Sequence, residues 1–308
     1  MIALRKRFRK APKEEQAPRL FCFGLGYSAM ALVRRLQARG WRVAGTSRAP
    51  SKAERLRAAG LEVFLFDRGL TLAADALQGT THLLVSVPPD DKGDPLIDGA
   101  REDILRCEGM VWAGYLSTTG VYGDREGGWV DEESALRPTQ ERSRRRAAAE
   151  RAWRELHRTA GLPVHIFRLA GIYGPGRSVL DNLRRGTAKR IDKPGQVFSR
   201  IHVEDIAAVL EASIERPNPG QVYNVCDDDP AAPADVVAYG AELLGLEPPP
   251  LVPFDEASLS AMALSFYRDN RRVANRRIHE ELGVRLAYPT YREGLQAVLE
   301  SVSSDQLA

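Results

Sequence analysis

The chain has few cysteines, and their spacing does not resemble that of metal ligands. The 308 residues include three cysteines, Cys22, Cys107 and Cys226, with no CxxC pair and no cysteine–histidine cluster. Zinc sites and disulfide frameworks both need such spacings, so neither is expected and no metal site is predicted. Reduced structural thiols are typical of cytoplasmic proteins, and a cytoplasmic location is expected.

The sequence also lacks a long apolar run. No stretch approaches the roughly 20 apolar residues that span a bilayer, so no membrane partner is expected. Residues 1–18 have no apolar core of a signal peptide; they are basic and then acidic. Such a composition cannot bury a core, which predicts a flexible basic tail.

The chain has no strong excess of charge of either sign. Lys and Arg number 44 and Asp and Glu 41, which gives a formal net charge of +3. This balance provides no global attraction to nucleic acid, and the arginine-rich stretch at 142–158 has no recognition-helix motif beside it. Nucleic acid is therefore not an expected partner, whereas the arginines suit a small anionic ligand.

From residue 19 to about residue 170, short apolar runs alternate with amphipathic stretches. Near-continuous apolar runs are typical of strands buried on both faces of a parallel sheet. Strands alternating with helices predict βαβ units, and so an α/β protein with a doubly wound parallel sheet, the Rossmann fold. The predicted strands are 19–23, 41–47, 61–66, 81–87, 111–117 and 162–170, and the predicted helices are 28–39, 51–59, 98–106 and 142–160.

Farther along the chain the alternation becomes irregular. A helix is expected at 203–215, a strand at 220–226 and a helix at 233–244, and a stiff proline-rich connector follows. The chain is therefore expected to form a Rossmann domain at 19–171 and a smaller C-terminal lobe at 172–308 that returns segments to the sheet.

A glycine-rich turn follows the first predicted strand. Gly24, Gly26 and Ala29 form a GxGxxA pattern that opens the first helix. The first glycine permits a tight turn, the second lets the backbone approach a pyrophosphate, and the small third residue allows close packing. With Tyr27 and the helix N-terminus they predict a dinucleotide site; a tight turn without a ligand is the alternative.

The end of the second predicted strand distinguishes between the two nicotinamide cofactors. NAD sites usually place Asp or Glu there to bind the ribose 2′-hydroxyl, but this chain has Ser47 and Arg48. No carboxylate is there to repel a 2′-phosphate and Arg48 could clamp one, so NADP is favoured over NAD. Further contacts are expected from Asp67 at the adenine end and Ser86 at the nicotinamide end.

Five blocks of sequence, taken in order, resemble the extended short-chain dehydrogenase/reductase superfamily, specifically its NAD-dependent epimerase/dehydratase type. The resemblance implies an NAD(P)-binding Rossmann domain and a substrate-binding lobe. It also implies oxidoreductase or epimerase activity on a nucleotide sugar or another anionic metabolite. Family members often form homodimers, so a homodimer is compatible with it. The blocks are FGLGYSA (23–29), YLSTTGVYGD (115–124), FRLAGIYGPGR (167–177), RIHVEDIAAVL (200–210) and QVYNVCDDDP (221–230).

The resemblance also implies roles for individual residues. In the family a Ser or Thr before the VYG block binds the reacting oxygen, which matches Thr118. Tyr122 is a further catalytic candidate, at a position that shapes the family's substrate pocket. The family's YxxxK motif falls on Arg142 and Arg146. Arg146 could replace the lysine as a fixed positive charge, but Arg142 cannot donate a proton as a tyrosine does.

Two functions follow from these residues. An NADP-dependent oxidoreductase or epimerase would hold the reacting oxygen with Thr118 and anionic groups of the substrate with Arg177 and Arg200. Because Arg142 stands where the family has its acid/base tyrosine, the alternative is an NADP-binding sensor or scaffold protein without turnover.

Overall fold

The computed structural model describes residues 17–305. The predicted flexible tail, residues 1–18, lies outside this part except for its last two residues. The chain divides into two units, which we call unit 1 and unit 2. Unit 1 comprises Met1–Thr118, Glu141–Arg168 and Ala207–Tyr223, and unit 2 comprises Thr119–Gln140, Leu169–Ile206 and Asn224–Ala308.

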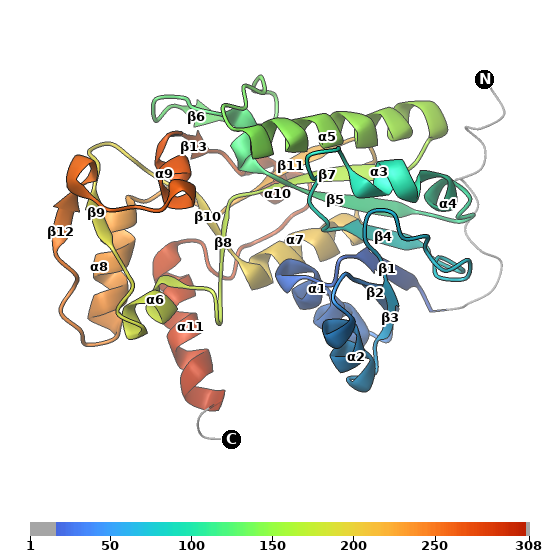
Figure 1. Ribbon diagram of the computed structural model, residues 1–308, viewed down its shortest axis with the longest axis horizontal. Coiled ribbons are helices and arrows are strands. Elements are labelled where there is room, and N and C mark those ends of the chain that lie inside the picture. The colour runs from blue at the N-terminus through green and yellow to red at the C-terminus, as the bar shows by residue number, and fades with distance from the viewer. Residues whose placement is uncertain (1–16, 306–308) are drawn as a thin grey trace. The chain divides into compact units, whose positions relative to one another are not determined.

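A seven-stranded parallel sheet organises unit 1 (Figure 1). Its strand order is β11-β7-β5-β4-β1-β2-β3, so the direction of winding reverses between β1 and β4. Ligands of open α/β sheets bind beyond the carboxyl ends of the strands at such a switch point. The predicted fold class, a doubly wound parallel sheet, is confirmed. The strands are β1 (Arg19–Phe23), β2 (Arg42–Ser47), β3 (Glu62–Leu65), β4 (His82–Val85), β5 (Trp112–Thr118), β7 (Val164–Leu169) and β11 (Val222–Val225).

Helices cover both faces of this sheet. Figure 1 shows α3, α4 and α5 on one face and α1 and α2 on the other. Phe21 and Phe23 of β1 pack with Trp153 of α5 in one core cluster, and the alternate residues Leu20 and Cys22 are equally buried. Burial of both faces explains why the strand is apolar after Arg19. The helices are α1 (Tyr27–Ala38), α2 (Pro50–Ala58), α3 (Pro95–Gly99), α4 (Arg101–Leu105), α5 (Glu141–Ala160) and α7 (Val203–Glu215).

The helix expected at 98–106 is two short helices instead, α3 and α4. The first begins earlier than expected because the Asp94 side chain accepts hydrogen bonds from the N–H groups of Leu96 and Ile97, with Pro95 in the first turn. Gly99 lies at the break between the two helices, and glycine is a poor helix former.

Unit 2 is built from short elements around a small core. Its strands form three parallel pairs, β8–β10, β9–β12 and β6–β13, and one core cluster includes Leu180, Val236 and Leu295. Within residues 17–305, no helix is long and apolar enough to cross a membrane. The elements are β6 (Trp129–Val130), β8 (Gly171–Tyr173), β9 (Arg190–Asp192), β10 (Arg200–His202), β12 (Leu251–Pro253), β13 (Arg272–Val273), α6 (Val179–Arg184), α8 (Pro233–Leu243), α9 (Ala261–Tyr267), α10 (Arg276–Glu280) and α11 (Tyr291–Asp305), with 3-10 turns at Thr119–Tyr122 and Phe254–Glu256.

A buried histidine in β4 makes the stability of the fold depend on pH. His82 packs edge-on against Trp41 with 4.6 Å between ring centroids, and burial lowers its pKa from 6.5 to about 4. Between these values the unfolded chain binds a proton that the folded chain does not, so the free energy of unfolding falls as the pH falls. The expected loss between pH 7 and pH 4 is about 3 kcal/mol.

The check is chemical denaturation of the wild-type protein and of His82→Leu at several pH values. The variant is expected to show a smaller loss of stability between pH 7 and pH 4 than the wild type. The same pH dependence in both proteins would exclude His82 as its source.

Candidate cofactor and active site

The predicted GxGxxA turn joins β1 to α1 at the switch point of the sheet. Gly24 has a φ of +88°, and a Cβ at this position would lie 3.0 Å from Ser86 Oγ and 3.1 Å from Val87 Cγ2. A side chain would strain the backbone and crowd the end of β4, so the turn needs glycine here. The Ser86 hydroxyl donates to the Gly24 carbonyl oxygen at 2.7 Å, which ties the ends of β1 and β4 together.

The start of α1 has the features of an anion-binding helix N-terminus. Its N-cap is Gly26, no side chain caps the helix, and its first turn contains no acidic residue. Ala29 is fully buried, as the close packing of this helix requires, and Tyr27 in the first turn is half-buried. The backbone N–H groups and the helix dipole favour negative charge at such an end. The residues present therefore fit the pyrophosphate of a dinucleotide.

The residues at the end of β2 differ in what their side chains bind. The Thr46 hydroxyl accepts from the Gly24 N–H at 2.9 Å, and the Ser47 hydroxyl donates to the Ala49 carbonyl oxygen at 3.1 Å. Arg48 is exposed and has no hydrogen bond or ion pair to any other residue that the structure describes. Thr46 and Ser47 thus shape the turn, whereas the charge of Arg48 is available to a ligand.

Two charged residues, Asp67 and Arg68, follow the end of β3. Asp67 is exposed, and within residues 17–305 its carboxylate accepts one hydrogen bond, from the adjoining Arg68 N–H at 2.9 Å. The Arg68 guanidinium forms ion pairs with Asp90 at 2.6 Å and with Asp98 at 2.7 Å, and these contacts raise its pKa. Arg68 therefore links the segments that follow β3 and β4, and Asp67 is left as the candidate at the adenine end.

The end of β5 brings Thr118 and Arg146 into one region. Thr118 is the last residue of the strand and is half-buried. Arg146 of α5 donates to the Leu116 carbonyl oxygen at 2.7 Å and to the Tyr115 hydroxyl at 3.2 Å, so its charge is fixed two residues before Thr118. Arg142, one helical turn earlier, is exposed. The Arg142 side chain is a guanidinium, which cannot act as a proton donor as a tyrosine does.

A buried ion pair beneath this region was not predicted from the sequence. Glu150 of α5 pairs with Arg168 of β7 at 2.8 Å, and both side chains are at most 3% exposed. The Ser117 hydroxyl also donates to Glu150, so the carboxylate joins β5, α5 and β7. One signal was present, since an arginine inside an apolar strand needs a buried partner.

The remaining predicted site residues belong to unit 2. The buried Tyr122 hydroxyl donates to Asn224 Oδ1 at 2.7 Å. Arg177 is exposed in a turn closed by backbone hydrogen bonds to Gly174. Arg200 is half-buried and donates through Nη1 to the carbonyl oxygens of Phe198 and Ala231, at 2.8 Å and 3.1 Å. In unit 2, Tyr122 is therefore held within the fold and Arg177 faces solvent.

The sheet order and the glycine turn define a Rossmann-type α/β protein. Residues 103–226 match the model of the NAD dependent epimerase/dehydratase family. The chain is also 32% identical over 242 residues to Protein YeeZ of Escherichia coli (strain K12), covering 73% of this chain and 84% of that protein. The chain therefore belongs to the NAD dependent epimerase/dehydratase family, for which an NAD(P) cofactor is expected.

Three further proteins show how far the similarity reaches. A functionally unknown conserved protein from Silicibacter pomeroyi DSS is 53% identical, with a TM-score of 0.85 over 93% of this chain and 99% of that one. The 3-diazoavenalumate denitrifying reductase of Streptomyces sp is 30% identical over 165 residues, 48% of this chain and 52% of that protein. dTDP-glucose 4,6-dehydratase from Bacillus anthracis in complex with NAD shares the fold, with 17% identity and a TM-score of 0.73 over 95% of this chain and 98% of that one.

Proposed function

We propose that the chain is an NADP-dependent oxidoreductase or epimerase that acts on a small anionic metabolite, such as a nucleotide sugar. Residues 19–171 would bind the cofactor and residues 172–308 the substrate. The observation that carries the proposal is a glycine turn without a side-chain cap, together with an arginine that has no partner among residues 17–305. Gly26 caps α1 without a side chain, so the free N–H groups of this helix would bind the pyrophosphate, and the exposed Arg48 would bind a 2′-phosphate.

The other contacts of the cofactor follow from the positions of the residues. The pyrophosphate would lie at the N-terminus of α1, with Asp67 near the adenine and Ser86 near the nicotinamide. When bound, the cofactor would supply hydride exchange with a substrate carbon. Ser86 already bonds to Gly24, so its position is fixed before the cofactor binds.

The chemistry of the protein itself would centre on the end of β5. The Thr118 hydroxyl would donate to the reacting oxygen of the substrate, and the fixed charge of Arg146 would stabilise negative charge that develops there. Because a guanidinium cannot serve as a proton donor as a phenol does, the proton would come from solvent. Tyr122, whose hydroxyl is held by Asn224, would position the loop rather than transfer a proton.

Replacing Thr118 by Ala is expected to lower turnover about a hundredfold or more, because one hydrogen-bond donor to the reacting oxygen is lost. NADPH binding is expected to stay within about twofold of wild type. The measurement is NADPH oxidation with the first substrate found in a screen of small anionic metabolites, beside an NADPH titration. Thr118→Ser should retain most activity, and Thr159→Ala, which removes an exposed hydroxyl of α5, should retain all of it. Unchanged turnover in Thr118→Ala would remove this residue from the mechanism.

A second candidate is an NADP-binding sensor or scaffold protein without turnover. It is favoured by the exposed Arg142 at the acid/base position and by Arg146, which already donates to the Leu116 carbonyl oxygen. Tight NADPH binding together with no NADPH oxidation above background, for any metabolite in the screen, would favour this candidate over the enzyme.

A further inference from the structure

Three aromatic side chains of unit 2 form a cluster around Tyr267. The centroid of its ring lies 5.3 Å from that of Phe198 and 5.3 Å from that of Phe254. Tyr267 is buried, whereas the two phenylalanines are half-buried. We call these three residues the aromatic cluster; part of its ring surface is open to solvent.

Two cations flank the aromatic cluster and differ in what they can still bind. Lys193 Nζ lies 4.8 Å from the centroid of Phe254 and donates to the Tyr267 carbonyl oxygen. Arg200 Cζ lies 6.0 Å from the centroid of Phe198. Arg200 uses Nη1 for backbone carbonyls, and its Nε and Nη2 have no protein partner in the part of the chain described. Arg200 therefore keeps the donors of Nε and Nη2, and the Lys193 ammonium, which has used one of its three N–H groups, also has donors left.

Asp227 lies beside Arg200, because its backbone N–H donates to the Arg200 carbonyl oxygen at 2.7 Å, but its carboxyl group forms no ion pair with the guanidinium. Asp227 is 1% exposed, and neither of its oxygens has a hydrogen-bond partner among the described residues. Burial raises the pKa of Asp227 to about 8, although the charge of Arg200 opposes this. Burial thus favours the neutral form of Asp227, and its carboxyl group occupies none of the Arg200 donors.

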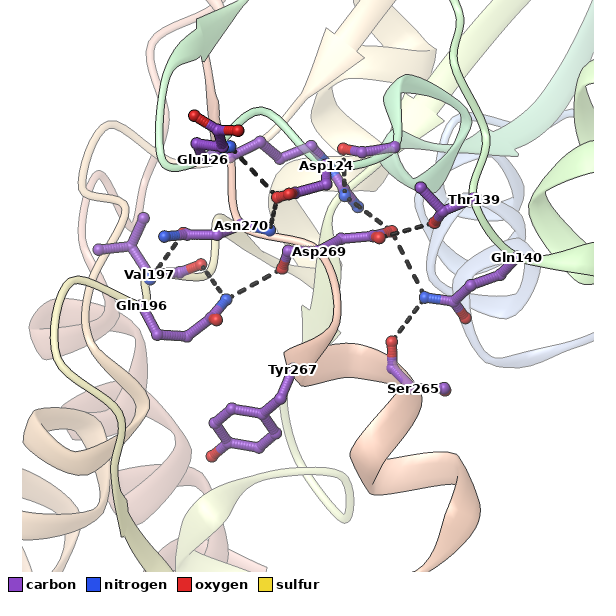
Figure 2. A network of polar contacts seen from close by, with 12 residues as sticks. Asp124, Glu126, Thr139, Gln140, Gln196, Val197, Ser265, Tyr267, Asp269 and Asn270 are labelled. Carbon is purple, nitrogen blue, oxygen red and sulfur yellow. Dashed lines mark hydrogen bonds and ion pairs between the residues drawn. The ribbon is translucent and has the colours of Figure 1, made fainter. Parts of the chain in front are cut away.

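The Gln196 side chain and the Tyr267 hydroxyl can each form a further hydrogen bond. Gln196 is 1% exposed; its amide nitrogen donates to the Asp269 carbonyl oxygen at 3.0 Å, but its Oε1 has no partner within residues 17–305. Figure 2 shows this oxygen on the side of Gln196 toward the Tyr267 ring, away from the polar network. The Tyr267 hydroxyl likewise has no described partner. A buried acceptor without a donor is costly unless a ligand or water satisfies it.

The polar network in Figure 2 links backbone segments around the cluster through hydrogen bonds. The Asn270 N–H donates to Asp124 at 2.7 Å, its side-chain nitrogen donates to the Gly195 carbonyl oxygen at 2.9 Å, and its Oδ1 accepts from the Val197 N–H at 3.1 Å. One residue therefore joins three segments of unit 2. Groups arranged before a ligand arrives lose little entropy when it binds.

Building on the proposed function, we infer that the aromatic cluster with Arg200 and Gln196 binds a planar aromatic carboxylate as the substrate class. The rings would pack against the planar part, Arg200 and the Tyr267 hydroxyl would donate to the carboxylate, and Gln196 Oε1 would accept from a ligand hydroxyl or a water. A nucleoside diphosphate fits less well. It carries more negative charge than a single carboxylate, and two cations, Lys193 and Arg200, flank these rings in the described structure.

The test is calorimetric titration of the full chain, without cofactor, with four probes. Cinnamate carries both the planar group and the charge, cinnamamide lacks the charge, cyclohexanepropionate lacks the planar ring, and UDP is the nucleoside diphosphate. Cinnamate is expected to bind about tenfold or more tightly than each of the others. Because no cofactor is present, the two proposals fail separately. If NADPH does not bind, the proposed function is contradicted but cinnamate binding still stands. If cinnamate does not bind, this inference is contradicted but NADPH binding still stands.

Cinnamate titrations of single-residue variants test whether the ligand binds at the aromatic cluster. Arg200→Gln and Tyr267→Leu are expected to weaken cinnamate binding about tenfold or more, and Tyr267→Phe less, since only the hydroxyl is removed. Arg184→Ala and Phe266→Leu, which change exposed side chains of α6 and α9, should leave binding unchanged. Circular dichroism identifies any variant that fails to fold, and Tyr267→Phe then carries the test. The inference is overturned if cinnamate does not bind, if UDP binds more tightly, or if folded Arg200→Gln and Tyr267→Phe both bind cinnamate like wild type.

Discussion

Replacing Glu150 by Ala is expected to lower the free energy of unfolding by about 3–5 kcal/mol, the usual cost of breaking a buried ion pair. The carboxylate pairs with Arg168 at 2.8 Å and accepts from Ser117, so its loss removes the acidic partner of a buried guanidinium. Urea unfolding at neutral pH measures the change.

Glu155→Ala is the matched control for this prediction. Glu155 lies on the same helix and pairs with Arg158, but both side chains are more than half exposed, so its loss should cost well under about 1 kcal/mol. If Glu150→Ala does not fold, the double variant Glu150→Leu/Arg168→Met, which removes both charges, should regain most of the stability. Equal, small losses for Glu150→Ala and Glu155→Ala would contradict the structural role of the pair.

Replacing Arg48 by Ala is expected to weaken NADPH binding about tenfold to a hundredfold, the range for one charge-assisted contact to a phosphate. NADH has no 2′-phosphate, so its affinity should stay within about twofold. Arg48 suits this test because it is exposed and has no ion pair to the described residues whose loss could disturb the fold. Titrations monitored by nicotinamide fluorescence give both dissociation constants.

An exposed arginine elsewhere in unit 1 provides the control for Arg48. Arg154 of α5 is also exposed, and Arg154→Ala should leave both cofactor affinities unchanged. Equal losses for NADPH and NADH in Arg48→Ala would show that this residue does not recognise the 2′-phosphate, and cofactor choice would then need another explanation.

The larger elements of the fold could be predicted because their physical signals are local and strong. The apolar run at 19–23 is β1 residue for residue, since a strand buried on both faces needs an apolar side chain at almost every position. The helix expected at 203–215 is α7 with the same bounds. By contrast, β8, β9 and β10 have three residues each, which is too short for any periodicity to appear.

The candidate site could be predicted only in part, for a related reason. The turn at Gly24 has a sequence signature because its backbone conformation requires glycine. Glu150 and Arg168, which pair with each other, are 18 residues apart and lie on different elements. In the sequence, Glu150 looks like one more charged residue of an exposed helix face. The surroundings of Arg200 likewise depend on Tyr267, which no motif connects to it. Contacts made by tertiary packing leave no local pattern to read.

The most direct test of the central claim, an NADP site at the β1–α1 turn, is a paired titration of the wild-type protein with NADPH and NADH, monitored by nicotinamide fluorescence. Because the Arg48 contact is available only to NADPH, this cofactor is expected to bind about tenfold or more tightly than NADH. Equal or tighter binding of NADH would contradict the preference for NADP, and no binding of either would mean that the glycine turn is a structural feature alone.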